Sequence, residues 1–421
     1  MLGKVFYFGP NFSLFKEICK RHNLQATQST KSKLQFALID IRDEIDATKT
    51  KKELEAIGKL TTSTVHEIKS QLSERRFICV LAKNQIRTGI YVPFAWNLAK
   101  SISAFLSLKD EKIGCIETTQ RDETSKASQS GSSIFYSLYF RKDENSQDSK
   151  PKFLSNYISD GKFPFAEFPF ERWYILKPKS RSKQEILHPA KYPEDLVKIH
   201  VEAFSSPRDN VFDPMSGTGS TQVGALKAGR NAFGMELSNF FGEIAKERCA
   251  AAIEPDLFSD ESYLHYRIEV GDCRTLMSLN FPEIDYVITS PPYWDMLNAK
   301  GAENQAKRIE KGLQTNYSDD EKDLGNVSNY DEFVTALASI YSDVARLMKT
   351  GSILTVVVKN IKKKGSNYPF AWDIASALQE EFELLPETFW LQDDISIAPF
   401  GYGNTWVSNT FHQYCLNFRK I

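Results

Sequence analysis

Long apolar runs are absent from this chain of 421 residues. A membrane-spanning helix needs about 20 consecutive apolar residues, and no stretch of the sequence approaches that length. Residues 1–9 also lack the long apolar core of a secretion signal. We therefore expect a protein that is neither secreted nor embedded in a membrane.

Paired cysteines and an excess of one charge are missing as well. The six cysteines are scattered without a Cys-x-x-Cys pair, which argues against a zinc site and favours a reducing, cytoplasmic location. The formal net charge is −1, so positive charge for binding a nucleic acid has to be local. The length predicts two or three domains, and 41% apolar residues indicate an ordinary globular chain.

Two common phosphate-binding motifs are also absent from the turn that contains Gly217 and Gly219. Residues 210–221 read as a strand, a turn with Gly217 and Gly219, and the start of a helix. The turn has no third glycine in Gly-x-Gly-x-x-Gly register and no Gly-Lys-Ser/Thr, so a dinucleotide fingerprint and a P-loop fit poorly. A close backbone approach to another ligand and a generic strand–turn–helix both remain open.

Acidic residues stand at the ends of the next two predicted strands. Glu236 ends an apolar strand, where a carboxylate can accept from both hydroxyls of a ribose; the alternative is a helix N-cap. Asp272 follows the strand 266–270 and suits an adenine amino group; the alternative is a turn aspartate.

The stretch Thr289–Trp294 contains two adjacent prolines directly after the apolar strand 285–288. Two prolines fix φ twice and remove two backbone donors, so the chain leaves the sheet in a rigid extended turn. A hydroxyl, free carbonyls and an aromatic face are then presented at the carboxyl end of a strand, where open α/β sheets bind ligands. This set suits a flat base with an exocyclic amine, which donates to the carbonyls while the base stacks on Tyr293. The alternative is a proline turn with a buried tyrosine.

The tetrapeptide Ser290–Tyr293 resembles the (Ser/Asp/Asn)-Pro-Pro-(Tyr/Phe/Trp) motif of the amino-methyltransferases of nucleic acids. The serine form is most similar to the DNA cytosine-N4 methyltransferases, whereas the Asp and Asn forms are more usual for adenine-N6. Residues 213–221 resemble the family's S-adenosylmethionine loop, and residues 188–193 resemble a motif that lies against the methionine end of that cofactor. The resemblance covers about residues 187–421.

The resemblance implies an α/β fold with a Rossmann-like class I methyltransferase sheet, and methyl transfer from S-adenosylmethionine to the N4 amine of a cytosine flipped out of double-stranded DNA. It implies no metal, and it makes a cognate restriction endonuclease a candidate partner. Adenine-N6 methylation, RNA methylation and a non-catalytic DNA-binding subunit remain alternatives, and the oligomeric state is open. The implied catalytic residues are Ser290, Pro291, Pro292 and Tyr293. The implied cofactor-binding residues are His188, Pro189, Lys191, Asp213, Pro214, Ser216, Gly217, Gly219, Glu236 and Asp272.

An internal repeat organises the rest of the chain. Lys-Asn at 83–84 leads to Pro-Phe-Ala-Trp at 93–96, and the same residues recur at 359–360 and 369–372, an offset of 276 residues. Residues 1–145 therefore look like a degenerate, partial copy of the same half-fold. Its counterpart of the proline turn, residues 39–42, has no proline, so this copy is expected to be catalytically inactive and to serve in packing or nucleic-acid contact.

Two further segments complete the expected domain plan around the catalytic domain at 187–421. Residues 146–186 form a linker whose aromatic and basic residues suit either a nucleic-acid surface or burial between domains. Residues 298–328 form a polar insertion, either a loop that closes over the flipped base or a surface loop. The cofactor loop precedes the proline turn, while the 188–193 motif is typical of members with the opposite order. A tandem copy that lost its first catalytic turn and kept the second explains both facts.

Overall fold

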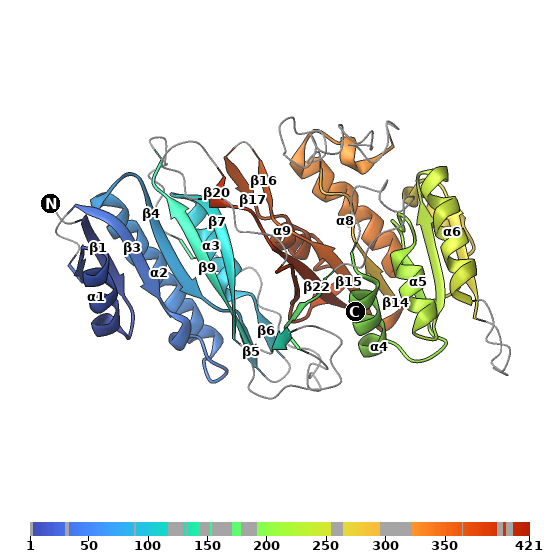
Figure 1. The fold of residues 1–421 in the computed structure, drawn as a ribbon, viewed down its shortest axis with the longest axis horizontal. Helices are drawn as coiled ribbons and strands as arrows, with labels where there is room; N and C mark the ends of the chain where they lie inside the picture. Colours follow the sequence, from blue (N-terminus) through green and yellow to red (C-terminus); the bar gives the residue numbers. More distant parts are fainter. Residues whose placement is uncertain are drawn as a thin grey trace.

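The computed structural model describes most of the chain. The described residues are 3–29, 33–87, 90–116, 129–131, 133–143, 152–153, 171–177, 192–253, 264–294, 322–363, 365–393, 399–400 and 407–421. Two β-sheets with their helices lie side by side along the long axis of the molecule (Figure 1). No helix among the described residues is long and apolar enough to span a membrane.

The second sheet, built from the later part of the chain, has the strand order of a class I methyltransferase. Its parallel strands are β13 (Tyr266–Val270), β12 (Asn231–Glu236), β11 (Asn210–Asp213), β14 (Ile284–Thr289) and β15 (Met348–Val358), in that spatial order. The antiparallel strand β22 (His412–Lys420) then inserts between β15 and β19 (Thr388–Leu391). The predicted Rossmann-like fold is therefore confirmed.

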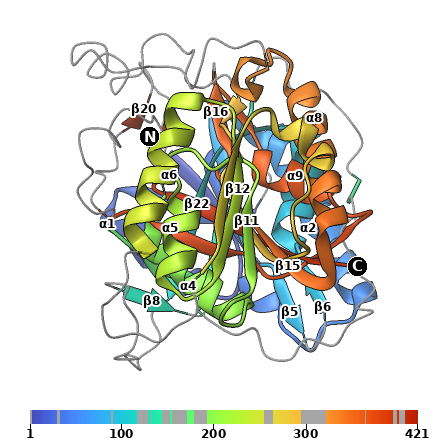
Figure 2. The same ribbon diagram turned by 90° about the vertical axis from the view of Figure 1, so that its right-hand side faces the viewer.

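Helices cover both faces of this sheet, as Figure 2 shows. One face carries α4 (Glu194–Phe204), α5 (Ser220–Lys227) and α6 (Asn239–Ile253), and the other carries α8 (Tyr330–Leu347) and α9 (Phe370–Ala377). Because both faces are covered, β14 is buried along most of its length instead of alternating. The sheet continues beyond β19 with β10 (Trp173–Ile175) and β8 (Gln129–Gly131), and β18 (Phe382–Leu384) pairs with β22.

The first sheet repeats this arrangement strand for strand. Its order is β2 (Leu24–Thr27), β1 (Gly3–Phe8), β3 (Leu34–Asp40), β4 (Leu72–Ala82), β9 (Ser133–Arg141) and β7 (Ser107–Ile116). These strands correspond to β12, β11, β14, β15, β22 and β19. The repeat thus extends beyond the half-fold that the sequence indicated, because β1 and β2 stand where the cofactor-side strands stand in the second sheet.

The shorter elements obey the 276-residue offset as well. The hairpin of β5 (Gln85–Arg87) and β6 (Ile90–Val92) matches that of β16 (Ile361–Lys363) and β17 (Ser366–Tyr368). The helix α3 (Phe94–Ser103) matches α9. In the sheets, Ile39 lies opposite Val80 as Thr289 lies opposite Val356, so Asp40 takes the place of Ser290.

Local sequence explains where the helices begin. Helix α1 (Phe12–Arg21) packs beside β1, and α2 (Lys51–Gln71) starts at a capping box in which Thr50 and Glu53 satisfy each other's backbone amides. Asn329 caps α8 by accepting from the amides of Asp331 and Glu332.

A single hydrophobic core joins the two copies. The indoles of Trp96 and Trp372, which are repeat equivalents, stack with ring centroids 6.2 Å apart and planes 18° apart. Both rings are buried, and the core cluster around them draws residues from both sheets. The two copies therefore pack as one body and not as separate domains on a linker.

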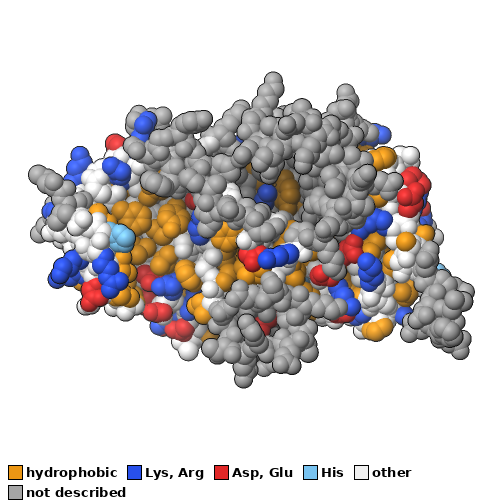
Figure 3. All heavy atoms as spheres, in the orientation of Figure 1, with side chains coloured by type: hydrophobic (Ala, Val, Ile, Leu, Met, Phe, Trp, Pro, Cys, Tyr) orange, Lys and Arg blue, Asp and Glu red, His pale blue; other side chains and the backbone are white. Residues whose placement is uncertain are grey.

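The expected linker is partly integrated into the fold. Trp173 and Tyr174, which the sequence offered either as a nucleic-acid surface or as buried residues, are buried in β10. Residues 154–170 and 178–191 lie outside the described part of the chain. On the face shown in Figure 3, the acidic and basic side chains of the described residues are interspersed. A short hairpin of β20 (Pro399–Phe400) and β21 (Val407–Ser408) completes the elements.

Candidate active site

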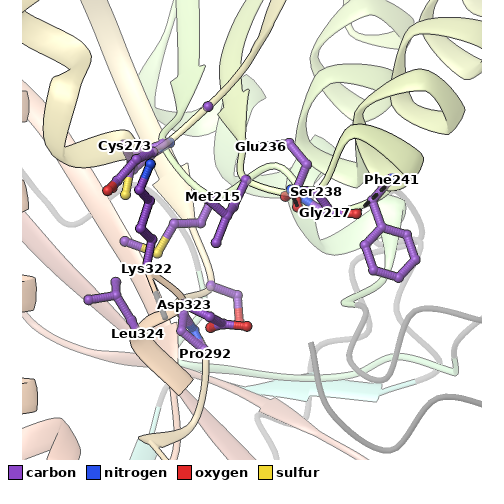
Figure 4. Close-up of a pocket in the computed structure, with 15 residues that line it drawn as sticks. Met215, Gly217, Glu236, Ser238, Phe241, Cys273, Pro292, Lys322, Asp323 and Leu324 are labelled. Carbon is purple, nitrogen blue, oxygen red and sulfur yellow. Dashed lines mark hydrogen bonds between the residues drawn. The ribbon is translucent and has the colours of Figure 1, made fainter. Parts of the chain in front are cut away.

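The carboxyl ends of β11, β12, β13 and β14 meet at one edge of the second sheet and line a pocket there. Figure 4 shows Glu236, Ser238 and Phe241 on one side of this pocket and Cys273 with residues 322–324 on the opposite side. The space between these walls amounts to about 670 Å³, part of which is open to solvent.

The glycine turn after β11 forms one wall. Gly217 and Gly219 have φ of +52° and +77°, values that favour glycine. The Ser216 amide donates to the Met235 carbonyl at 2.8 Å, which ties the turn to β12. A Cβ on Gly219 would lie 2.9 Å from the Cβ of Ala245, so α6 packs directly against the turn. Pro214, Met215 and Gly217 face the pocket.

Asp213 points into the protein and not into the pocket. Its carboxylate accepts from the Met215 amide at 2.9 Å, the Thr221 hydroxyl at 2.5 Å and the Tyr192 hydroxyl at 3.2 Å. Burial raises the pKa of this carboxyl, and the hydrogen bonds oppose that shift. Ser216 is also buried and accepts from the Gln222 amide group at 2.9 Å. Both residues therefore shape the turn, while their direct contact with a cofactor stays a prediction.

Glu236 sits at the end of β12 with its carboxylate in the pocket (Figure 4). One oxygen accepts from the Gly217 amide at 2.8 Å and the other from the Ser238 amide at 2.9 Å. Burial raises the pKa of Glu236 to about 7 despite these two bonds. The side chain thus links the glycine turn to the start of α6 and titrates near neutrality.

Asp272 lines the pocket and is also a turn aspartate. It caps the short 3-10 helix Cys273–Ser278 by accepting from the Arg274 amide at 3.0 Å, and it pairs with the Arg274 guanidinium at 2.8 Å. Partial burial raises its pKa, but the bonds from Arg274 outweigh that effect and leave the pKa below its usual value. Asp272 is therefore a turn aspartate that also lines the pocket, and its contact with an adenine amino group stays a prediction.

The proline turn closes the pocket from the β14 side. Ser290 and Pro292 line the pocket, and Pro291 is buried. The Tyr293 hydroxyl donates to Gln413 Oε1 on β22 at 2.6 Å, and burial raises the pKa of that hydroxyl. Tyr293 is therefore held beside the cofactor-side pocket and is only partly exposed.

Lys359 was missed by the sequence reasoning. Its ammonium lies 5.0 Å from the centroid of the Tyr293 ring, in the range of a cation–π contact. Burial lowers the pKa of Lys359, and the charge of Lys362 lowers it further. The only sequence signal was its place in the repeated Lys-Asn pair at a strand end.

Trp294 anchors the far end of the turn. Its φ is +42°, and its buried indole lies edge-on to the rings of Tyr330 and Tyr368, 5.3 and 5.0 Å away. The Lys363 ammonium lies 3.7 Å from the indole centroid. This cluster fixes the backbone that leaves the proline turn, a role that the sequence did not indicate.

Several predicted or missed residues belong to neighbouring segments. His188, Pro189 and Lys191 lie outside the described residues. Tyr192, in the same motif, was not predicted as a site residue, yet its hydroxyl bonds to Asp213. Most of the expected insertion also lies outside the described part, but residues 322–324 at its end line the pocket.

The first copy has a different arrangement at the corresponding place. Asp40, in the position of Ser290, pairs with Arg42 at 2.7 Å, and the Arg42 guanidinium lies 4.5 Å from the centroid of the Phe135 ring. Tyr7, in the register position of Asp213, stacks on Phe15 at 4.6 Å. The Asp40–Arg42 ion pair thus takes the place of the proline turn. The stacked ring of Tyr7 takes the place of Asp213.

Metal ligands do not converge in this region. Within the described ranges, no group of three or more His, Cys, Asp or Glu side chains is arranged to hold a metal ion.

Known proteins share similarity with parts of this chain. A family model described as DNA methylase matches residues 43–247. The chain is 29% identical over 93 residues to the type II methyltransferase M.BglII of Bacillus subtilis, covering 22% of this chain and 25% of that protein. It is 37% identical over 82 residues to the orphan methyltransferase M.BamHII of Bacillus amyloliquefaciens, covering 19% and 31%. The chain thus spans about a quarter to a third of these curated relatives.

Among solved structures, TrmN from Thermus thermophilus matches with 12% identity and a TM-score of 0.33, over 92% of this chain and 72% of that one. A putative rRNA methylase from Clostridium thermocellum matches with 13% identity and a TM-score of 0.33, over 55% and 99%.

The strand order of the second sheet makes the protein a class I methyltransferase in fold. Residues 43–247 are similar to the DNA methylase family, and shorter stretches are similar to type II and orphan methyltransferases, which are enzymes that depend on S-adenosylmethionine.

Proposed function

We propose that this chain transfers a methyl group from S-adenosylmethionine to the exocyclic N4 amine of a cytosine in double-stranded DNA. One observation carries the proposal. The glycine turn, Glu236 and Asp272 line the same pocket as Ser290 and Pro292 of the proline turn. Residues suited to a nucleoside cofactor and residues suited to a target base are therefore in reach of one another.

The donor and acceptor chemistry of the pocket fits this cofactor. Each oxygen of the Glu236 carboxylate accepts one backbone amide, which leaves a lone pair on each for the two hydroxyls of a ribose. Asp272 stands at the next strand end for an adenine amino group, and Phe241 supplies an apolar wall. Asp213 keeps the glycine turn in shape from behind. When bound, S-adenosylmethionine supplies a methyl group on a positively charged sulfur.

The proline turn supplies the base side of the site. The Ser290 hydroxyl and the Pro291 carbonyl hold the exocyclic amine, and the Tyr293 ring stacks on the base. Gln413 fixes the Tyr293 hydroxyl and Lys359 lies over its ring, so the base takes the ring face that Lys359 leaves open. Flipping the base out of the duplex costs a few kcal/mol. Alignment of the amine accounts for much of the rate.

Cytosine is proposed over adenine because residue 290 is serine. Adenine-N6 methylation uses the same turn and differs in the shape of the base pocket. The relatives named type II methyltransferases favour a restriction-modification setting with a cognate endonuclease as partner.

Product identity tests the proposal. The protein is incubated with S-adenosylmethionine and unmethylated genomic DNA, and the digested nucleosides are read by mass spectrometry. We expect N4-methylcytosine from the unsubstituted chain and at least a hundredfold less from Tyr293→Ala, because the stacked base loses its alignment. N6-methyladenine instead would overturn the assignment of cytosine. Neither base in DNA, with cofactor still bound, would overturn DNA as the substrate.

A further inference from the structure

The two copies contact each other through two buried glutamates, one from each copy. Glu111 on β7 and Glu387 just before β19 are repeat equivalents, and both are almost fully buried. Each accepts hydrogen bonds from a tyrosine and an asparagine of the other copy. Glu111 accepts from Asn360 at 2.7 Å and Tyr414 at 2.9 Å, and Glu387 accepts from Asn84 at 3.3 Å and Tyr136 at 2.6 Å.

Glu111 binds Asn360, and the residue before Asn360 contacts the ring of Tyr293. Asn360 donates to Glu111 with its amide nitrogen and accepts from the Ala371 amide with its oxygen, at 2.7 and 2.9 Å. This side chain is therefore fixed at both ends. Its neighbour Lys359 places its ammonium 5.0 Å from the Tyr293 ring centroid. Holding Asn360 consequently holds the strand end from which Lys359 projects.

Glu111 also binds Tyr414, and the residue before Tyr414 accepts from the hydroxyl of Tyr293. Glu111 accepts from Tyr414 on β22 and lies 3.5 Å from His412 Nε2, so it touches two residues on one face of that strand. Side chains alternate along a strand. Gln413, between them, therefore points to the other face, where it accepts from the Tyr293 hydroxyl at 2.6 Å.

The equivalent contact of Glu387 lies beside residues of the first copy, which has no tyrosine in the position of Tyr293. Its partners Asn84 and Tyr136 belong to the first copy, whose turn carries Asp40 and Arg42 in place of a Ser-Pro-Pro-Tyr. The pseudo-symmetry thus supplies a comparison, because both carboxylates accept from an equivalent tyrosine and an equivalent asparagine. Glu387 differs in that it also pairs with Arg172 at 3.0 Å and accepts from the Tyr91 hydroxyl.

We propose that Glu111 is a positioning residue which the first copy contributes to the second. It fixes Tyr293 for the target base by holding the residues beside both of its contacts, Lys359 and Gln413. The first copy is then part of the working site, although it carries no catalytic turn of its own. This inference rests on the function proposed above, since a positioned Tyr293 matters through the base that stacks on it.

Matched variants test the proposal in the full-length chain. Glu111→Gln keeps the side-chain size but turns an amide toward a donor, and Tyr414→Phe removes a single hydroxyl in case the first variant does not fold. Tyr136→Phe removes the equivalent hydroxyl at the mirror contact. We expect kcat to fall on the order of tenfold or more in the first two variants, with unchanged affinity for S-adenosylhomocysteine. We expect Tyr136→Phe to keep the parent kcat.

A swap separates positioning from packing. In the double variant Glu111→Gln with Asn360→Asp, the amide and the carboxylate exchange places, so a hydrogen bond forms again with its direction reversed. We expect this double variant to recover most of the lost kcat. An unchanged kcat in Glu111→Gln, or an equal loss in Tyr136→Phe, would overturn the proposal.

A readout without turnover distinguishes this inference from the proposed function. Hydrogen–deuterium exchange of the peptide 289–294 reports how firmly the proline turn is held. We expect faster exchange there in Glu111→Gln and Tyr414→Phe, and parent-like exchange in Tyr136→Phe. If the parent methylates no DNA, the proposed function fails but this comparison still decides the positioning role. Equal exchange of this peptide in all variants would overturn the positioning role of Glu111.

Discussion

Glu236 is a pocket side chain whose charge changes near neutral pH. Burial raises its pKa to about 7, although two backbone amides stabilise the carboxylate. A carboxylate offers lone pairs on both oxygens to a ribose diol, whereas the protonated acid offers fewer. The ionisation of one residue is therefore expected to set the pH dependence of cofactor binding.

Affinity for S-adenosylhomocysteine should rise with pH through about 7. Below that pKa the carboxyl is protonated, so the dissociation constant should grow up to about tenfold per pH unit as the solution is acidified. Above about pH 8 the affinity should level off. Calorimetric titrations between about pH 5.5 and 8.5 check this, with Glu236→Gln as the control that binds weakly and without this slope. A constant affinity for the parent over that range would contradict the assignment.

Single residues also mark where sequence reasoning stops. Glu236 and Ser290 were predicted as site residues because their places at strand ends follow from local sequence. The inward turn of Asp213 was not foreseen, since its partner Tyr192 comes from 21 residues earlier in the chain. Gln413 reaches Tyr293 from 120 residues away, a contact that only the folded sheet creates.

At the scale of elements, the strand–turn–helix at 210–227 is the best-determined part of the site. Gly219 combines a positive φ of +77° with a close approach to α6, whereas Gly229 has nearly the same φ of +78° with no atom within 4 Å of a Cβ. The two glycines therefore separate backbone strain from steric packing.

Gly219→Ala should lower the free energy of unfolding by about 2–5 kcal/mol, because a left-handed alanine costs roughly 1–2 kcal/mol and crowding adds about 1–3 kcal/mol. Gly229→Ala should lose only the first part. Urea unfolding measures both values, and cofactor affinity should fall for Gly219→Ala alone. Equal losses of unfolding free energy in the two variants would contradict this prediction, because they would mean that α6 makes room for the alanine at no energetic cost.

At the scale of the whole molecule, two copies of one fold share a core, and the second copy carries the candidate site. The repeat was visible in the sequence because the Lys-Asn and Pro-Phe-Ala-Trp residues kept their spacing. The extra strands β1 and β2 of the first copy were not recognised as part of it, because the glycine turn that marks β11 has no equivalent there. The family match at 43–247 runs from the first copy into the cofactor half and ends before the proline turn at 289–294.

Unfolding should follow from this shared core. Trp96 is buried against Trp372 of the other copy, so Trp96→Ala should destabilise both copies together, by about 3–5 kcal/mol. Calorimetry should show one transition that shifts as a whole. Leu60→Ala, at a site with 61% exposure, should leave it in place. Two transitions, of which Trp96→Ala moves only one, would mean that the copies unfold independently.

The stoichiometry of cofactor binding tests the central claim of two copies and one site most directly. Isothermal titration of the full-length chain with S-adenosylhomocysteine should give one site per chain, and Glu236→Ala should remove it. The first copy should add no second site, because Tyr7 and the Asp40–Arg42 pair stand in the corresponding places. Two sites per chain, one site that survives Glu236→Ala, or no binding at all would contradict the account.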